Sequence, residues 1–179
     1  LPPLLSISAN LSSLNQTSPR ILLVFVDLFL TPTINVLIKP KFGFPRILQL
    51  RDKPIWISKL EGEIDFKESI VLHFRVGIDA QANLSFRQPE LAYYLKGLEI
   101  LKERKKYGAT YVLSDNVKQV KEIFGFELGG EVNYLEMPKH AAPAERLYVL
   151  SLFGGIVCAN STFCGWAAWS IYNSGGNVV

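Results

Sequence analysis

Three clusters of polar residues in the chain have side chains suited to holding an anion. They are His73 with Arg75, the tripeptide Ser114-Asp115-Asn116, and the tripeptide Asn160-Ser161-Thr162. Arginine offers a bidentate guanidinium fork to phosphate. The other two clusters consist of residues that favour helix N-termini, where free backbone N–H groups and the positive end of the helix dipole attract anions. The predicted ligand is therefore an anion, and a phosphate or diphosphate suits these donors best.

The first cluster follows an apolar run, Ile70-Val71-Leu72, that is typical of a strand covered on both faces. Pro89 is then expected to open a helix that ends before Gly108. The apolar positions of this helix follow the three-four spacing of one buried face: Leu91, Tyr94, Leu95, Leu98 and Leu101. The first polar cluster thus lies between a predicted strand and a predicted helix.

The same alternation continues along the rest of the chain. Further strands are expected at residues 110–113, 132–135 and 156–159, and helices from residue 117 to a stop at Gly125, over residues 143–153, and through Trp166 and Trp169. This alternation predicts an α/β fold, a Rossmann-like, mostly parallel sheet with helices on both faces. Because ligands bind beyond the carboxyl ends of such strands, the three clusters are predicted to meet there.

Composition limits the size and class of the protein. Its 179 residues, 49% hydrophobic and 20% charged, suffice for a core but for little more than one domain. A net charge of +3 from dispersed basic residues lacks the electrostatic footprint of a nucleic-acid-binding protein, so no nucleic acid partner is expected. Two histidines and two cysteines are too few for a closed zinc site or a disulfide framework, and Cys158 and Cys164 are interpreted as packing residues.

Residues 1–68 form an N-terminal segment that matches no recognised pattern. Residues 1–20 are typical of a loop rather than a signal peptide. The apolar run 21–30 is too short to span a bilayer and contains Asp27, so no membrane span is expected. Strands or short helices are expected at four apolar runs: residues 21–26, 34–38, 45–50 and 54–57.

Two further features leave alternatives open. The alternating Glu61, Glu63 and Asp65 could imitate an acidic metal site, but a solvated strand face or turn is the preferred interpretation. The chain begins at Leu1 and ends on the apolar Asn177-Val178-Val179, which is typical of a strand cut short. The sequence is therefore interpreted as a piece of a longer one.

Four segments resemble motifs of the alpha-1,2-fucosyltransferase family and follow the family's order. Residues 71–77, VLHFRVG, resemble VHIRRGDY, and residues 111–116, YVLSDN, resemble FFVFSDD. Residues 147–152, LYVLSL, resemble DLYLMSL, and residues 156–169, IVCANSTFCGWAAW, resemble the signature IIANSSFSWWGAW. The resemblance covers about residues 68–173 and leaves the first third of the chain unmatched.

This resemblance implies that residues 69–179 form the donor lobe of a GT-B glycosyltransferase. Members of the family bind GDP-fucose in this lobe and hold a galactosyl acceptor with the help of an N-terminal lobe. They transfer fucose with inversion and without a metal ion. Residues 1–68 would then be a reduced acceptor lobe. The implied partners are a nucleotide sugar and a glycan acceptor; no cofactor beyond the donor substrate is implied, and peripheral membrane association stays open.

Mapped residue by residue, the resemblance implies a phosphate site. Arg75 would hold the diphosphate and stabilise the charge of the leaving GDP, which is among the largest contributions to catalysis. His73 would brace that loop or touch the nucleotide, and His73 and Asp79 are the alternatives for the general base. Nucleotide or sugar contacts are implied for six further residues: Ser114, Asp115, Asn160, Ser161, Thr162 and Phe163.

Some positions depart from the family pattern. The second arginine of the first motif is Val76, Ile78 displaces the motif aspartate to Asp79, and the first tryptophan of the signature is Gly165, which is expected to loosen a buried aromatic cluster. The Gly-rich GGLGNQ opening of the family is absent before residue 70. Three functions therefore remain: an active transferase, a degenerate nucleotide-sugar-binding lobe, and a Rossmann-like interaction module whose polar clusters are only helix caps.

Overall fold

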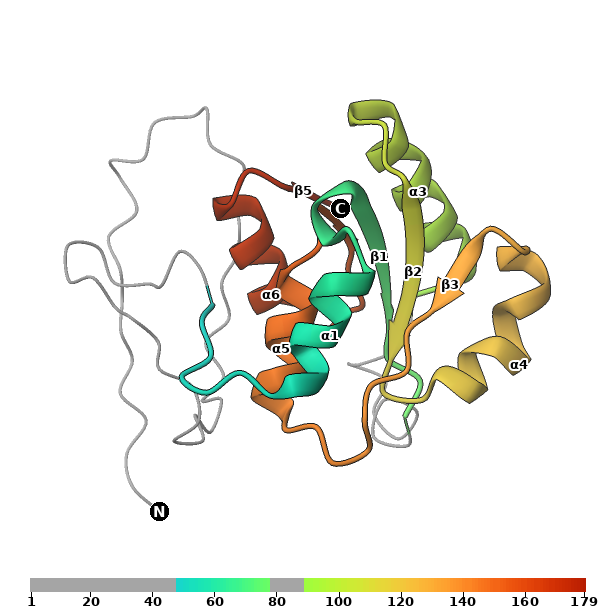
Figure 1. Ribbon diagram of the computed structural model, residues 1–179. Coiled ribbons are helices and arrows are strands. Elements are labelled where there is room, and N and C mark those ends of the chain that lie inside the picture. The colour runs from blue at the N-terminus through green and yellow to red at the C-terminus, as the bar shows by residue number, and fades with distance from the viewer. Residues whose placement is uncertain (1–47, 78–88) are drawn as a thin grey trace, which may run out of the picture.

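The computed structural model describes residues 48–77 and 89–179, which form an α/β fold around a five-stranded sheet (Figure 1). The strands are β1 (Ser69–Phe74), β2 (Ala109–Ser114), β3 (Val132–Tyr134), β4 (Gly155–Val157) and β5 (Asn177–Val178). Their order is β3-β2-β1-β4-β5, and every neighbouring pair is parallel. The predicted fold class, a parallel Rossmann-like sheet, is confirmed.

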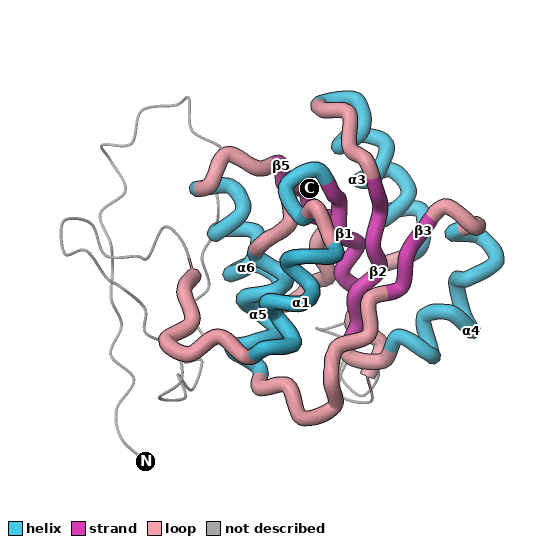
Figure 2. The backbone as a smooth tube through the Cα atoms, viewed as in Figure 1, coloured by secondary structure: helices cyan, strands magenta, loops and turns pink. Residues whose placement is uncertain are grey.

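Helices cover both faces of the sheet, giving three layers (Figure 2). The helices are α1 (Ile55–Glu63), α3 (Leu91–Arg104), α4 (Val117–Leu128), α5 (Pro143–Ser151) and α6 (Thr162–Asn173), with a short 3-10 helix, η1 (Phe66–Glu68), before β1. Helices α3 and α4 pack on one face, and α1, α5 and α6 pack on the other. Among the described residues, no helix is both long and apolar enough to cross a membrane.

The central strand β1 divides the core into these two layers. All six of its residues are buried. Ile70, Leu72 and Phe74 pack with α3 and α4, whereas Val71 packs with α1, α5 and α6. His73 is two residues after Val71, so the alternation of a strand places it on the α1, α5 and α6 side.

Helix α4 continues past its predicted end. Gly125 lies inside the helix, which ends at Leu128 and is followed by Gly129 with a φ of 71°. A positive φ is readily adopted by glycine, so the helix ends there, and the apolar contacts of Leu128 carry it one turn beyond Gly125.

The buried face of α3 also differs from the prediction at one position. Leu95 is 40% exposed. Gly97 is buried in its place, and a Cβ at that residue would lie 2.7 Å from Cγ1 of Val157. The helix packs against β4 through its smallest residue, which a count of large apolar side chains does not detect.

Part of the predicted N-terminal segment packs on the sheet. Ile57 of α1 and Phe66 of η1 belong to the same buried cluster as Val71 and Ile156. The boundary predicted at residues 68 and 69 stays a prediction. The apolar runs 21–26 and 34–38 lie outside the described residues.

The acidic run before β1 is not a strand face. Glu61 and Glu63 lie in α1, and Oδ1 of Asp65 accepts a hydrogen bond from the Glu68 N–H at 3.3 Å, which caps η1. Glu61 is also paired with Lys53 at 2.7 Å. The interpretation left a strand face or a turn open; the strand face was wrong, because Glu61 and Glu63 are separated by helical turns, whereas Asp65 lies at the turn that starts η1. Nowhere in the described ranges do three His, Cys, Asp or Glu residues gather to hold a metal ion.

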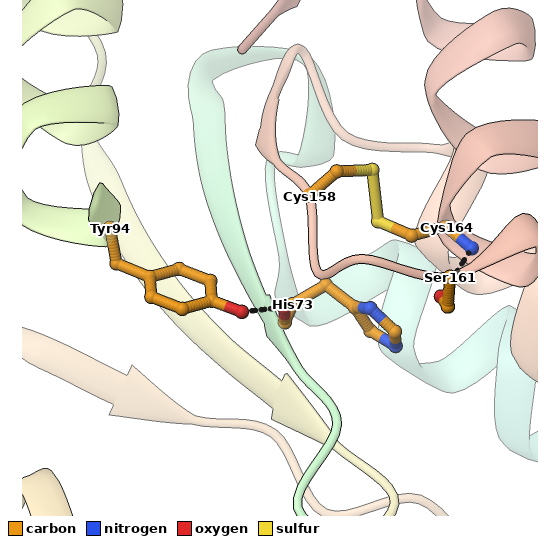
Figure 3. Close-up of a disulfide and its surroundings, with 5 residues drawn as sticks. All are labelled: His73, Tyr94, Cys158, Ser161 and Cys164. Carbon is orange, nitrogen blue, oxygen red and sulfur yellow. Dashed lines mark hydrogen bonds between the residues drawn. A yellow bond between two sulfur atoms is a disulfide. The ribbon is translucent and has the colours of Figure 1, made fainter. Parts of the chain in front are cut away.

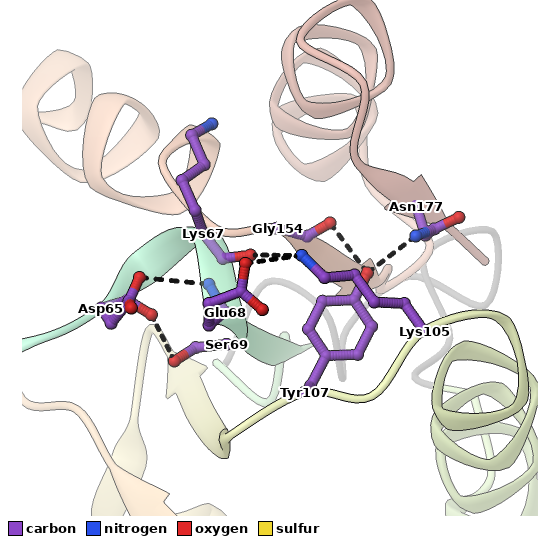
Figure 4. Close-up of polar contacts among 8 residues, drawn as sticks. All are labelled: Asp65, Lys67, Glu68, Ser69, Lys105, Tyr107, Gly154 and Asn177. Atoms are coloured by element: carbon purple, nitrogen blue, oxygen red, sulfur yellow. Dashed lines mark hydrogen bonds and ion pairs between the residues drawn. The ribbon is translucent and has the colours of Figure 1, made fainter.

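Polar contacts tie the strands together at the amino end of the sheet (Figure 4). The Tyr107 hydroxyl donates to the Gly154 carbonyl at 3.1 Å and accepts from Nδ2 of Asn177 at 2.8 Å. Nζ of Lys105 donates to Oε1 of Glu68 at 2.8 Å. A Cβ on Gly154 would collide with the Lys67 carbonyl. These contacts fix the strand starts, whereas open parallel sheets bind their ligands at the opposite, carboxyl end.

Candidate functional site

A cavity of about 420 Å³ lies at the carboxyl end of the sheet. Its walls come from the ends of β1 and β2 and from the starts of α5 and α6. The lining residues are His73, Phe74, Arg75, Leu113, Ser114, Asp115, Met137, Pro143, Arg146, Ser161 and Phe163. All three predicted polar clusters therefore contribute to one cavity, as the fold argument expected.

The cavity lies where the strand order reverses. The chain passes from β1 to β2 and β3 on one side, and then returns to the other side of β1 as β4. The loops that leave β1 and β4 diverge at this point and leave a crevice, which is where open α/β sheets bind their ligands. Arg75 follows β1, and Ser161 and Phe163 follow β4.

His73 is buried at the wall of this cavity. Burial lowers the pKa of its imidazole from 6.5 to about 4, with the Asp115 carboxylate opposing the shift and the Arg75 charge adding to it. The ring lies over the ring of Phe163, with centroids 5.9 Å apart. Its Nδ1 is buried and has no hydrogen-bond partner among the described residues. The neutral imidazole thus lines the cavity, while its Nδ1 is covered by the protein.

The other side of β1 fixes the backbone at this residue. The Tyr94 hydroxyl donates to the His73 carbonyl at 3.1 Å. Figure 3 shows Tyr94 and the imidazole on opposite sides of the strand. Tyr94 is itself fully buried and stacks on Phe74 with a centroid distance of 4.0 Å. The position of His73 is thus set by the core rather than by solvent-exposed contacts.

Asp115 holds the loop that follows β1. Its Oδ1 accepts from the Val76 N–H at 3.0 Å and its Oδ2 from the Gly77 N–H at 2.9 Å. The Ser114 hydroxyl also donates to Oδ1 at 3.0 Å. A carboxylate with three donors already bound has a clear role in positioning the loop that carries Arg75. The predicted contact of Asp115 with a nucleotide stays a prediction.

The second cluster also starts a helix. Oδ1 of Asn116 accepts from the Gln119 N–H at 3.1 Å and caps α4. The Ser114 hydroxyl accepts from the Asn116 N–H at 3.1 Å. Ser114 lines the cavity, whereas Asn116 does not. The cap predicted from these residue types is confirmed, and it is the turn before the cap that faces the cavity.

The third cluster is split in the same way. Ser161 caps α6, since its hydroxyl accepts from the Cys164 N–H at 3.1 Å. Ser161 and Phe163 line the cavity, while Asn160 and Thr162 are exposed and do not. The cap takes up the Cys164 N–H, whereas the N–H groups of Thr162 and Phe163, at the first two positions of α6, have no acceptor within the helix.

Cys158 and Cys164 form a disulfide, which corrects their interpretation as packing residues (Figure 3). The bond joins the end of β4 to the first turn of α6, with Cα atoms 5.6 Å apart. Cys164 is also fully buried against the core, so packing was only part of its role. The prediction failed because it counted cysteines for a whole framework and did not consider one local bridge across a turn. The bridge closes the turn that contains Ser161 and Phe163.

Arg146, Met137 and Pro143 line the cavity but were not predicted as site residues. They follow β3, in the loop to α5 and in its first turn. Pro143 at the first position of α5 is a sequence signal for a helix N-terminus, and in a parallel sheet this N-terminus must also lie at the carboxyl edge. That signal could have identified Arg146 one turn later.

Two departures from the family pattern acquire a structural meaning. Val76 is 5% exposed and packs in the core with Phe74 and Tyr94. Gly165 is exposed, and nothing lies within 4 Å of a Cβ placed there. The prediction that Gly165 loosens a buried aromatic cluster was therefore wrong, because a side chain at this position would point to solvent. Asp79 lies outside the described residues.

Comparison with known proteins gives a distant structural likeness. No protein-family model matches the chain, and no curated protein matches it. A crystal structure of the fucosyltransferase NodZ from Bradyrhizobium is similar at 15% identity and a TM-score of 0.42, over 63% of this chain and 39% of that one. NodZ alpha-1,6-fucosyltransferase soaked with GDP-fucose is similar at 16% identity and a TM-score of 0.41, over 69% of this chain and 44% of that one. This chain spans less than half the length of either structure, and at this similarity no activity follows for it; the alpha-1,2 linkage stays a prediction.

Proposed function

We propose that the cavity binds GDP-fucose and that the protein takes part in fucosyl transfer to the 2-hydroxyl of a galactosyl acceptor, with inversion. The observation that carries this proposal is the meeting of His73, Arg75 and Ser161 at one cavity. These residues come from motifs far apart in the sequence, and each motif resembles a fucosyltransferase motif at the position that faces the cavity.

In the proposed reaction, the acceptor oxygen attacks C1 of fucose on the face opposite the diphosphate. The bond between C1 and the diphosphate oxygen breaks, GDP leaves with the bonding electrons, and the acceptor proton passes to a base. Arg75 stabilises the charge that develops on GDP, and the N-terminal N–H groups of α6 add to this stabilisation. No metal ion is needed for such a step when arginine and helix N-termini supply the positive charge.

The proposed role of His73 is to hydrogen-bond the bound nucleotide sugar. Because its pKa is lowered to about 4, the imidazole is neutral at pH 7 and is a weak base. Because Nδ1 is covered by the protein, the proposed hydrogen bond to the ligand is assigned to Nε2, the other ring nitrogen. An ordinary aspartate is no stronger a base, so base strength does not separate His73 from Asp79, and both stay candidates for the base.

The second candidate function is nucleotide-sugar binding without transfer. It is favoured by Val76, which takes the position of the second motif arginine but is buried in the core. A backbone N–H of this residue is also bound to Asp115, so the loop cannot present a second charge from this position. The interaction module without ligand is less consistent with a cavity that contains an arginine and an unpartnered buried histidine nitrogen.

Calorimetry with GDP and GDP-fucose tests these functions. The wild-type protein is expected to bind both nucleotides, and Arg75→Ala to weaken binding by at least about tenfold, because a hydrogen bond to a charged group contributes about 1.5–3 kcal/mol. Arg104→Ala is the control, since Arg104 lies in the last turn of α3, away from the cavity. Absence of binding at millimolar concentration would refute both ligand-based functions. Binding without fucose transfer to lactose-type acceptors would leave the binding lobe.

A further inference from the structure

A second arginine faces the cavity from a different element. Arg146, in the first half of α5, lines the cavity together with Arg75. The two are the only arginines or lysines among its lining residues in the described part of the chain. They approach it from different walls, because Arg75 follows β1 and Arg146 is carried by the helix that precedes β4.

The guanidinium of Arg146 is held in place by the loop before α5. Nε donates to the Ala141 carbonyl at 3.0 Å, and Nη2 donates to the Pro138 carbonyl at 3.0 Å. A longer contact joins Nη2 to the Lys139 carbonyl at 3.5 Å. Within the described ranges Nη1 makes no hydrogen bond. Fixing one side of the fork to the backbone removes much of the rotamer entropy that an arginine otherwise loses on binding a ligand.

No acidic side chain neutralises Arg146 within the described residues, since all three of its acceptors are backbone carbonyls. The partly buried position therefore keeps an uncompensated positive charge at the cavity wall. An arrangement of this kind is favourable when the cavity holds an anion.

Val76 explains why a second charge from α5 matters. The residue after Arg75 is buried and apolar, so the described start of the β1 loop, residues 75–77, supplies one guanidinium only. A nucleoside diphosphate carries two adjacent phosphoryl groups, which one arginine fork does not neutralise. We propose that Arg146 is the second phosphate-binding residue of the site and contacts the diphosphate together with Arg75. This inference rests on the proposed function, because it takes a nucleoside diphosphate as the ligand.

Substitution of Arg146 in the full chain, with calorimetry against GDP and guanosine, tests the inference. Arg146→Gln is expected to weaken GDP binding by about 10- to 100-fold, the range for losing a charge-assisted hydrogen bond, and to leave guanosine binding unchanged. Glutamine keeps an N–H donor for the loop carbonyls but removes the charge. Arg146→Lys, which keeps the charge, is expected to bind GDP more tightly than Arg146→Gln. Arg104→Gln is the control and is expected to match the wild type.

The result separates a phosphate contact from a structural clamp. An equal loss for GDP and guanosine, or unchanged GDP binding, would overturn the inference, and so would equal GDP affinities of the glutamine and lysine variants. Loss of GDP binding in Arg75→Ala but not in Arg146→Gln would refute the role of Arg146 alone. Failure of the wild-type protein to bind GDP would refute the proposed function and this inference together.

Discussion

Replacing Asp115 with alanine tests whether its carboxylate holds the loop that positions Arg75. The substitution removes the acceptor for three donors, at 3.0 Å from Val76 N–H, 2.9 Å from Gly77 N–H and 3.0 Å from the Ser114 hydroxyl. The Gly77 N–H is exposed and gains water in exchange, whereas the contacts of Val76 and Ser114 are partly buried. Each of the two partly buried donors left without an acceptor costs about 1–3 kcal/mol, so the expected loss of unfolding free energy is about 2–6 kcal/mol.

A loss of this size is measurable by thermal unfolding followed by circular dichroism. For a chain of this length, each 1 kcal/mol lowers Tm by about 2–4 °C, so Asp115→Ala should lower Tm by roughly 4–24 °C. Asp115→Asn keeps one carbonyl oxygen for Val76 but presents an NH₂ group to Gly77, and an intermediate decrease is expected. Exposed Glu122 provides a matched control, because Glu122→Ala removes an acidic side chain from the same part of the chain. A Tm within about 1 °C of the wild type for Asp115→Ala, with unchanged affinity for GDP, would refute the clamp.

Three further predictions concern the fold around the site. Gly154→Ala should lower Tm strongly, because the alanine Cβ would collide with the backbone carbonyl of Lys67. Gly165→Ala is the control, since a Cβ at Gly165 meets no other atom within 4 Å. Equal Tm values for the two variants would contradict the packing at Gly154. The Cys158–Cys164 disulfide joins cysteines that are six positions apart in the sequence, and its reduction should lower the free energy of unfolding by about 2 kcal/mol. A denaturant midpoint that a dithiol reductant does not change would count against the bridge. The folded-state pKa of His73, about 4, lies below its ordinary value of 6.5, so the unfolded chain binds a proton first as the pH falls. The free energy of unfolding should therefore decrease between about pH 6.5 and pH 4, by about 3 kcal/mol in all. His73→Gln should remove this part of the pH dependence, and an unchanged profile would show that His73 is not buried as a neutral group.

The parallel sheet and its ligand edge were predictable because the signals are local and repeated. Runs such as residues 70–72, followed by helix-opening residues, specify strand-helix alternation one unit at a time. Right-handed crossovers in a parallel sheet then bring every strand end to the same edge without knowledge of side-chain contacts. His73, Arg75, Ser114 and Ser161 could be placed at one site for this reason alone.

What the sequence did not predict depends on contacts between distant residues or on exact geometry. Gly97 replaces Leu95 on the buried face of α3 because β4 approaches the helix closely, and no periodicity encodes that distance. Arg146 faces the cavity only because α5 begins at the same edge as β1 ends. The disulfide across Ser161 depends on a turn that brings two Cα atoms to 5.6 Å. Gly97 and the disulfide require the assembled fold, whereas Arg146 could have been inferred from Pro143 and the parallel sheet.

The central claim is that the cavity beside β1 binds the diphosphate of a nucleotide sugar, and a crystal structure of the protein with GDP tests it most directly. The predicted result is a diphosphate within hydrogen-bond distance of the Arg75 guanidinium, with an atom of the ligand contacting the His73 imidazole. GDP bound elsewhere on the protein, or a cavity that stays without nucleotide at saturating GDP, would contradict the claim.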